Sequence, residues 1–201
     1  MLFARQQKYA EIKRVIKKDG FDLVYINIRY PEMQGRKSFD RTFDRFYKNI
    51  ASSFLVFAEK TLATDAQKHM TDDGFEPAAA VMKARIMLDS KKYCSALCEA
   101  SVFDGQSHAQ RHITGNVWSK KQACLVPRGA MLAKNYCDIL AEKYSHDLAV
   151  GQDELKRLFR RSAVCFSSLG LEFHISLGGE IKTVCLPFDT ALLEGIAKIK
   201  P

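Results

Sequence analysis

The sequence predicts an α+β protein, in which a mixed or antiparallel sheet is covered by one long helix and two shorter helices. Segments rich in β-branched and aromatic residues, bounded by turn residues, occur near the start, in the middle and at the end of the chain. Between the first two lies a segment that keeps the apolar period of a helix for about six turns. With 201 residues, 47% of them hydrophobic, the chain can bury a sizeable core.

The first third of the chain predicts a helix, a strand and then the long helix. Residues 1–20 combine apolar and basic positions in the pattern of a basic amphipathic helix. "FDLVYINIRYPEM" alternates in the manner of a strand and ends at Pro31, which cannot donate a hydrogen bond to a sheet. From Ser38, a suitable N-cap, an aromatic stripe beginning at Phe39 predicts the long helix. We interpret this stripe as the face that packs on the sheet.

The turn signals of "TDDGFEP" (residues 71–77) place a soft boundary between an N-terminal subdomain, 1–75, and a strand-rich C-terminal domain, 76–201. The two parts are expected to pack intimately and could form one domain. Extended segments are predicted at about 80–90 and 92–103, and "VWSKKQACLVP" predicts a third. Helices are then expected after Pro127 and over "DELKRLFRR", and "SAVCFSSLGLEFHISLGGEIKTVCLPFD" predicts three strands joined by tight turns.

The net charge of +8 favours an acidic partner such as nucleic acid, anionic lipid or acidic protein. The lysines and arginines are scattered in pairs, so charge alone does not choose among these partners. If nucleic acid is the partner, we expect the N-terminal helix to meet phosphates through the side chains of Lys13, Arg14, Lys17 and Lys18. The six cysteines are expected to be free, mostly buried thiols. A cytoplasmic location is expected, because no apolar run approaches the roughly 20 residues that cross a bilayer.

A metal site is not predicted, although the order and spacing of Cys94, Cys98, His108 and His112 in the sequence resemble a zinc ligand set. On a strand, a spacing of four residues separates two ligands by roughly 13 Å, whereas each ligand must lie about 2.0 to 2.3 Å from zinc. We therefore expect no metal and no cofactor at these residues.

An enzyme is not predicted either, since no local catalytic signature appears. A cysteine nucleophile would need a base such as His146 or His174 with a carboxylate or amide beside it, and no sequence motif joins such residues. The phosphate-binding, dinucleotide-binding, nucleophile-elbow and zincin motifs are absent from the sequence.

The stretch "FDGQSHAQRHITGNVW" (residues 103–118) predicts a strand end, a turn at Gly105 and a return strand that begins near His112. Two interpretations stay open for it. His108 can satisfy backbone groups of an ordinary loop. Alternatively, the loop is an exposed recognition edge in which Phe103, His108 and Trp118 anchor a partner.

The same loop resembles a turn of the RsiV-like ectodomain family, which is known from a lysozyme-sensing anti-sigma factor and from the non-catalytic part of a peptidoglycan deacetylase. The family turn reads aromatic-Thr-Gly-Gly-Ala-His-Gly, and "FDGQSHA" keeps the aromatic residue, one glycine and the histidine. Other matching places, covering about residues 21–193, are "INIRYPEM", Asn116, Leu125, the segment after Pro127, "VCFSSLGLEFHI" and "LPF".

This resemblance implies a module that binds a protein or glycan, with any catalysis carried by another domain. Lysozyme binding is not implied, because the turn is altered. The sequence therefore predicts a non-enzymatic binding module with Phe103, Gly105, His108 and Trp118 near its recognition edge. The alternative is a basic nucleic-acid-binding protein. Salt separates the two, because binding to phosphates weakens steeply as the salt concentration rises.

Overall fold

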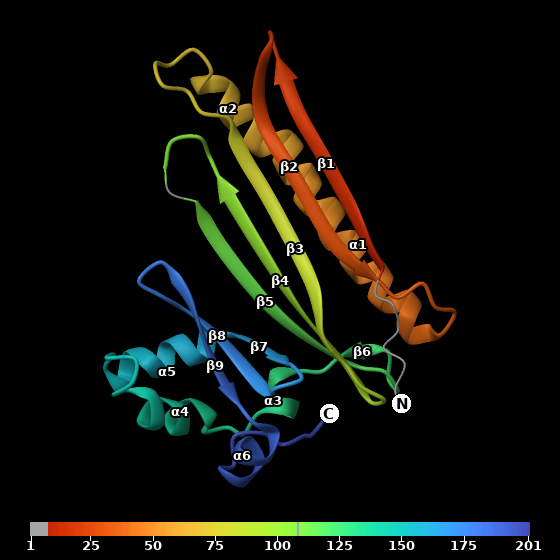
Figure 1. The fold of residues 1–201 in the computed structure, drawn as a ribbon, viewed down its shortest axis with the longest axis vertical. Coiled ribbons are helices and arrows are strands. Elements are labelled where there is room, and N and C mark those ends of the chain that lie inside the picture. Colours follow the sequence, from red (N-terminus) through yellow and green to blue (C-terminus); the bar gives the residue numbers. More distant parts are fainter. Residues whose placement is uncertain (1–7, 108) are drawn as a thin grey trace. The chain divides into compact units, whose positions relative to one another are not determined.

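The computed structural model describes residues 8–107 and 109–201, which form two compact units. Unit 1 comprises Met1–Arg85 and Cys98–His112, and unit 2 comprises Ile86–Leu97 and Ile113–Pro201. Strands and helices occur in both units, so the predicted α+β class is confirmed (Figure 1). No helix in the described ranges combines the length and apolarity that are required to span a membrane.

The strands form two sheets. The first has the order β1-β2-β3-β4-β5-β6, and the second has the order β7-β8-β9. The first sheet is mixed, because β1 pairs antiparallel with β2 whereas β2 pairs parallel with β3. The strands are β1 (Lys8–Lys18), β2 (Phe21–Glu32), β3 (Ala78–Asp89), β4 (Tyr93–Phe103), β5 (Gln110–Ser119), β6 (Cys124–Leu125), β7 (Ala163–Phe166), β8 (Leu171–Leu177) and β9 (Glu180–Leu186).

The helical segments divide into one long run and several short helices. They are α1 (Ser38–Phe57), the π-helical turn η1 (Ala58–Leu62), α2 (Ala63–His69), α3 (Arg128–Met131), α4 (Tyr136–Tyr144), α5 (Gln152–Arg161) and α6 (Phe188–Leu193). The long helix predicted from Ser38 is confirmed as the α1–η1–α2 run. The strands predicted near 80–90 and 92–103 are confirmed as β3 and β4.

The prediction of an N-terminal helix is wrong, because the described part of this segment is strand β1. It forms a hairpin with β2 around Asp19 and Gly20, whose φ angles of 51° and 87° are both positive. Asp-Gly is a strong signal for this type of hairpin turn. The spacing of Ile12, Val15 and Ile16 fits a helix, but pairing with β2 outweighs that local preference.

In unit 1, α1 lies along one face of β2 (Figure 1). Its aromatic stripe supplies Phe39, Phe43 and Tyr47, all at most 5% exposed, and the adjacent rings are in contact. The stripe is therefore core, as predicted. The α1–α2 run also explains the parallel pairing of β2 with β3, since parallel neighbours need a long crossover connection.

In unit 2, the β7-β8-β9 sheet packs its apolar face on the aromatic residues of α4 and α5. Phe173 of β8 stacks on Tyr136 at 5.9 Å and meets Phe159 edge-on at 5.8 Å, measured between ring centroids. Burial is the largest cause that raises the pKa of Tyr136, to about 12. Its hydroxyl group donates to the carbonyl oxygen of Phe159 and accepts from Arg128.

Two predicted elements in unit 2 are interrupted. The helix expected after Pro127 is divided into α3 and α4, because Leu132 is extended and forms a β-bridge with Ala197. The strand predicted over "VWSKKQACLVP" ends at Ser119, and the chain then turns back so that β6 pairs with the end of β5. The three C-terminal strands are confirmed as β7, β8 and β9.

Candidate functional site

The loop between β4 and β5 is organised by one carboxylate. Asp104 Oδ1 accepts hydrogen bonds from the backbone N–H groups of Gln106 (3.0 Å) and Ser107 (2.8 Å), and its Oδ2 accepts from the Ser107 hydroxyl (2.8 Å). These bonds lower the pKa of Asp104 to about 2, with the Ser107 backbone bond as the largest cause. Because Gln106 and Ser107 are exposed, the loop presents polar groups in a fixed arrangement.

Gly105 lets this loop lie against another segment of unit 1. Its φ is 90°, and a Cβ placed there would lie 2.4 Å from the carbonyl oxygen of Glu76. A side chain at this position would therefore need both a strained backbone and a displaced neighbour. The turn predicted at Gly105 is present.

The structure does not bring all the predicted recognition residues to one exposed edge. Phe103 is half-buried in unit 1, at the end of β4. Trp118 belongs to unit 2 and is only 2% exposed, so its ring is buried and cannot meet a partner as an exposed anchor. His108 lies outside the described residues. A recognition role for Phe103, Gly105 and His108 stays a prediction.

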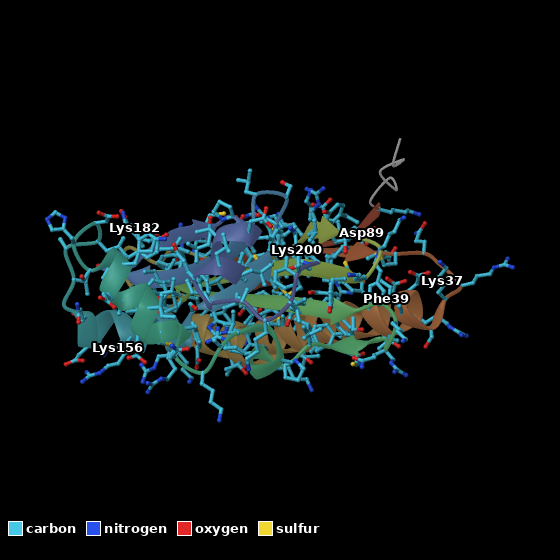
Figure 2. The ribbon with its side chains drawn as sticks, turned by 90° about the horizontal axis from the view of Figure 1, so that it is seen from below. Lys37, Phe39, Asp89, Lys156, Lys182 and Lys200 are labelled. Carbon is cyan, nitrogen blue, oxygen red and sulfur yellow. The ribbon has the colours of Figure 1, made fainter. Side chains whose placement is uncertain are left out.

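The basic residues predicted to meet phosphates lie on strand β1, and three of them pair with carboxylates in unit 1. Lys13 lies 3.0 Å from Glu11, Lys17 lies 2.9 Å from Asp22, and Arg14 contacts Glu59. These pairs reduce the positive charge that β1 presents. Other lysines come from separate elements, for example Lys37 before α1, Lys156 on α5 and Lys182 on β9 (Figure 2).

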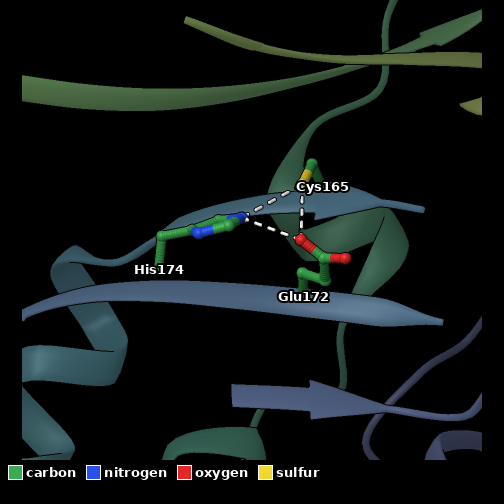
Figure 3. Close-up of side chains that lie close together, drawn as sticks. All are labelled: Cys165, Glu172 and His174. Atoms are coloured by element: carbon green, nitrogen blue, oxygen red, sulfur yellow. Dashed lines mark hydrogen bonds and ion pairs between the residues drawn. The ribbon is translucent and has the colours of Figure 1, made fainter. Parts of the chain in front are cut away.

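A second cluster of functional groups lies on β7 and β8 in unit 2. The pairing register places Cys165 directly opposite Glu172, and His174 follows two residues later on the same face of β8 (Figure 3). The three residues are between 0% and 6% exposed. We call Cys165, Glu172 and His174 the buried triad.

The three side chains converge on one point. Cys165 Sγ lies 3.4 Å from His174 Nε2 and 3.9 Å from Glu172 Oε2, and Nε2 and Oε2 are 3.1 Å apart. The other ring nitrogen of the histidine, Nδ1, lies 3.0 Å from the hydroxyl oxygen of Thr183 on β9. All these groups belong to unit 2, and each strand of its sheet supplies at least one of them.

This arrangement differs from a nucleophilic Cys–His pair that is oriented by a carboxylate. In that type of site the thiol and the orienting group contact opposite nitrogens of the imidazole ring. Here the thiol and the carboxylate both face Nε2, Nδ1 faces the Thr183 hydroxyl rather than a carboxylate, and burial of the cluster keeps a substrate away from the sulfur atom. The geometry therefore does not support a cysteine nucleophile.

The residues around the buried triad are apolar on the side of β4, whereas a hydroxyl and a thiol group neighbour it on β9. Leu97 of β4 packs with Ala163 and Cys165, and partly buried Met87 and Ile113 cover this group. On β9 the residues that share the face of the triad are Thr183, which is exposed, and Cys185, which is half-buried. Burial, followed by the charge of the nearby Glu172, raises the pKa of the Cys185 thiol.

A backbone contact fixes the position of β7. A Cβ placed on Gly115 of β5 would lie 2.1 Å from the carbonyl oxygen of Val164. The Phe166 N–H group donates to the buried Ser95 hydroxyl at 2.8 Å. Because these contacts lie within unit 2, they place Cys165, which lies between the two β7 residues, independently of unit 1.

The sequence carries a signal for the buried triad in the spacing of "CFSSLGLEFH" (residues 165–174), a hairpin whose register brings its ends together. The four residues that resemble a zinc set, Cys94, Cys98, His108 and His112, have a different spacing, and the two cysteines lie on strand β4, which keeps them apart. His174 is a possible base in the sequence, but no motif joins it to Cys165 and Glu172.

Known proteins share the fold of this chain but indicate nothing more specific about it. No protein-family model matches the sequence, and no curated protein matches it. Among solved structures, the chain is similar to a DUF3298 family member from Bacteroides fragilis, with a TM-score of 0.61 and 9% identity, over 96% of this chain and 94% of that chain. It is also similar to a DUF3298 family protein from Pseudomonas aeruginosa, with a TM-score of 0.58 and 13% identity, over the same shares.

At these identities the likeness concerns the backbone alone. The chain therefore has the fold of the solved DUF3298 proteins, and these neighbours indicate no catalytic function and no ligand.

Proposed function

We propose that this chain is a non-catalytic binding module for a protein or glycan, and that the β4–β5 loop is its recognition edge. The recognition edge consists of residues 103–107 and 109–110. The observation that carries the proposal is the Asp104 network, which holds an exposed polar loop in one arrangement. A loop ordered before binding loses less conformational entropy when a partner arrives, so more of the contact energy appears as affinity.

The non-catalytic part of the proposal depends on the buried triad. Among the described clusters of Cys, His and acidic groups, the buried triad comes closest to a catalytic set. Catalysis is disfavoured because the triad is buried and because its thiol and carboxylate both contact the same imidazole nitrogen. A binding module places its functional groups on an exposed loop supported by a rigid sheet, as this loop is. The resemblance to RsiV-like domains points in the same direction.

The nucleic-acid alternative receives less support. Its expected contacts on β1 are partly neutralised by Glu11, Asp22 and Glu59. We therefore retain it as an outcome of the experiment that tests the binding module.

The test is capture of a partner from the native cell lysate at low and at moderately high salt, with the full chain as bait. Gln106→Arg alters the recognition edge, and Gln67→Arg is a matched control because Gln67 is also an exposed glutamine of unit 1. We expect a discrete protein or glycan that wild type and Gln67→Arg retain at the higher salt, and that Gln106→Arg loses. Recovery of nucleic acid alone, lost as salt rises, would contradict the proposal.

A further inference from the structure

We propose that Cys165, Glu172 and His174 bind a zinc ion in unit 2, with a water molecule in the fourth coordination position. This site is independent of the recognition edge, which lies in unit 1. The proposal rests on the identity of the three ligands, on their mutual distances and on the group behind the histidine.

The ligand atoms of the triad have the chemistry that zinc requires. Zinc in proteins is bound by cysteine sulfur, histidine nitrogen and carboxylate oxygen, and the triad supplies one of each. A thiolate with an imidazole favours zinc or copper over the hard cations that prefer oxygen ligands alone. Each ligand comes from a strand of a paired sheet, so its position is held by the backbone hydrogen bonds of the ladder.

The distances between the ligand atoms also fit a zinc ion. In a tetrahedral zinc site, sulfur lies about 3.5 Å from nitrogen or oxygen, and nitrogen lies about 3.3 Å from oxygen. The corresponding distances in the triad are 3.4, 3.9 and 3.1 Å. A triangle with these sides has its circumcentre about 2.0 Å from each atom, which is close to the zinc–ligand distances of about 2.0 to 2.3 Å.

The imidazole ring of His174 is oriented like that of a metal-binding histidine. A histidine that binds a metal through one nitrogen almost always donates its other N–H group to a neighbouring acceptor. The Thr183 hydroxyl oxygen lies 3.0 Å from His174 Nδ1 and can accept this hydrogen bond. That bond directs Nε2 toward Cys165 and Glu172, so Thr183 acts as a positioning residue.

The coordination number follows from the number of protein ligands. Leu97 and Ala163 close the side of Cys165 with apolar groups. With three protein ligands, the fourth position of a tetrahedral zinc ion is left for a water molecule. Binding of zinc displaces the thiol proton of Cys165 into solvent, because the metal ligand is the thiolate.

The experiment uses the full chain, stripped of metal by a chelator under reducing conditions and then titrated with zinc. We expect uptake of one equivalent, and a rise in Tm of about 5 to 10 °C when free zinc exceeds its Kd about a hundredfold. Substitution with cobalt should give a thiolate-to-metal charge-transfer band, which reports a cysteine ligand, and loss of this band in Cys165→Ala would identify which of the six cysteines it is. Uptake below a tenth of an equivalent by folded wild type, or a cobalt complex without the thiolate band, would overturn the proposal.

Variants test whether the triad is the site. Cys165→Ala, Glu172→Gln and His174→Gln should each reduce zinc affinity at least tenfold, whereas Cys124→Ala and His146→Gln should leave it unchanged, since both control residues are exposed and lie outside the triad. Circular dichroism of each metal-free variant shows whether it is folded, and Glu172→Gln keeps the size of the side chain. One equivalent bound equally well by all three triad variants would place zinc elsewhere and overturn the proposal.

Capture of a partner at the recognition edge has its own variant, Gln106→Arg. Failure of that experiment is therefore distinguishable from failure of the zinc site.

Discussion

The two faces of the β7-β8-β9 sheet are made by the same strands and differ completely in chemistry. One face carries Val164, Phe166, Leu171 and Phe173, which pack into the core of unit 2. The opposite face carries the buried triad at alternate positions of β7 and β8. Over residues 163–166 of β7 and 171–175 of β8 both faces are removed from water, so burial alone does not explain why one of them is polar.

Of the two faces, the apolar one is expected to contribute most of the stability. Burial of a large apolar side chain contributes about 1.5 to 3 kcal/mol. Burial of ionisable groups costs free energy unless they are paired, and an apolar set of similar volume is often at least as stable. The apolar face therefore supplies most of the stability of this sheet, whereas Glu172 and His174 pair with each other at the desolvation cost of two buried polar groups, a cost that zinc binding would offset.

The largest expected effect is on the apolar face. Phe173→Ala removes a fully buried ring that contacts Tyr136 and Phe159, so the free energy of unfolding should fall by about 3 to 5 kcal/mol. Urea unfolding measures this loss. Leu169→Ala is the control, because Leu169 is 72% exposed and should change the free energy of unfolding by less than about 0.5 kcal/mol. Equal losses in the two variants would contradict the division into faces.

The contact that positions β7 should give the next largest effect. In Gly115→Ala the new methyl carbon would meet the backbone of Val164, which cannot rotate away as a side chain could. We expect a loss of about 1 to 3 kcal/mol in urea unfolding. Gly129→Ala serves as the comparison, since no heavy atom lies within 4 Å of a Cβ placed there and its φ is not positive. A loss at position 129 that equals the loss at 115 would show that the contact has no special role.

A smaller effect is expected on the polar face, where a substitution should lower the zinc affinity without lowering the free energy of unfolding. Thr183→Val removes the acceptor behind His174, so zinc affinity should fall about tenfold. The free energy of unfolding of the metal-free protein should change by less than about 1 kcal/mol, because Thr183 is exposed. Isothermal titration with zinc and urea unfolding give the two values. Thr183→Ser keeps the hydroxyl and should restore the affinity, and failure to do so would remove the positioning role.

Most of the fold could be predicted from the sequence, because most of its helices and strands are indicated by local sequence patterns. The period of α1 and the turns around β8 follow from spacing and from glycine. Strand β1 could not be recognised from the same rules, since its apolar residues also fit a helix. Its pairing with β2, which decides the structure, is visible in the sequence only through Asp19 and Gly20.

The candidate sites were harder to predict, because they depend on register and burial. Cys165 and Glu172 meet only if the hairpin pairs with the register that it has, and a shift of one residue would place them on opposite faces. Trp118 was expected at an exposed edge because tryptophan is enriched at interfaces. Aromatic residues also dominate cores, and nothing in the local sequence separated these two roles for Trp118.

The smallest expected effect concerns Asp104, an exposed carboxylate that contrasts with the buried Glu172. Backbone and hydroxyl donors hold the pKa of Asp104 at about 2 in the folded protein, below its ordinary value of 3.8. A lowered pKa in the folded state stabilises that state above the unfolded pKa. This contribution should therefore be complete well above pH 3.8, diminish as the pH falls below that value and be lost as the pH falls through about 2.

Asp104→Asn should lack this pH-dependent part of the stability, while its fold stays unchanged because the site is exposed. NMR titration of the Asp104 carboxyl group measures the pKa directly, and acid unfolding of wild type and variant compares their stabilities. A midpoint near 3.8 would mean that the Asp104 network is not formed in solution. The recognition edge would then lack the preorganisation from which its role is argued, whereas the zinc site would be unaffected.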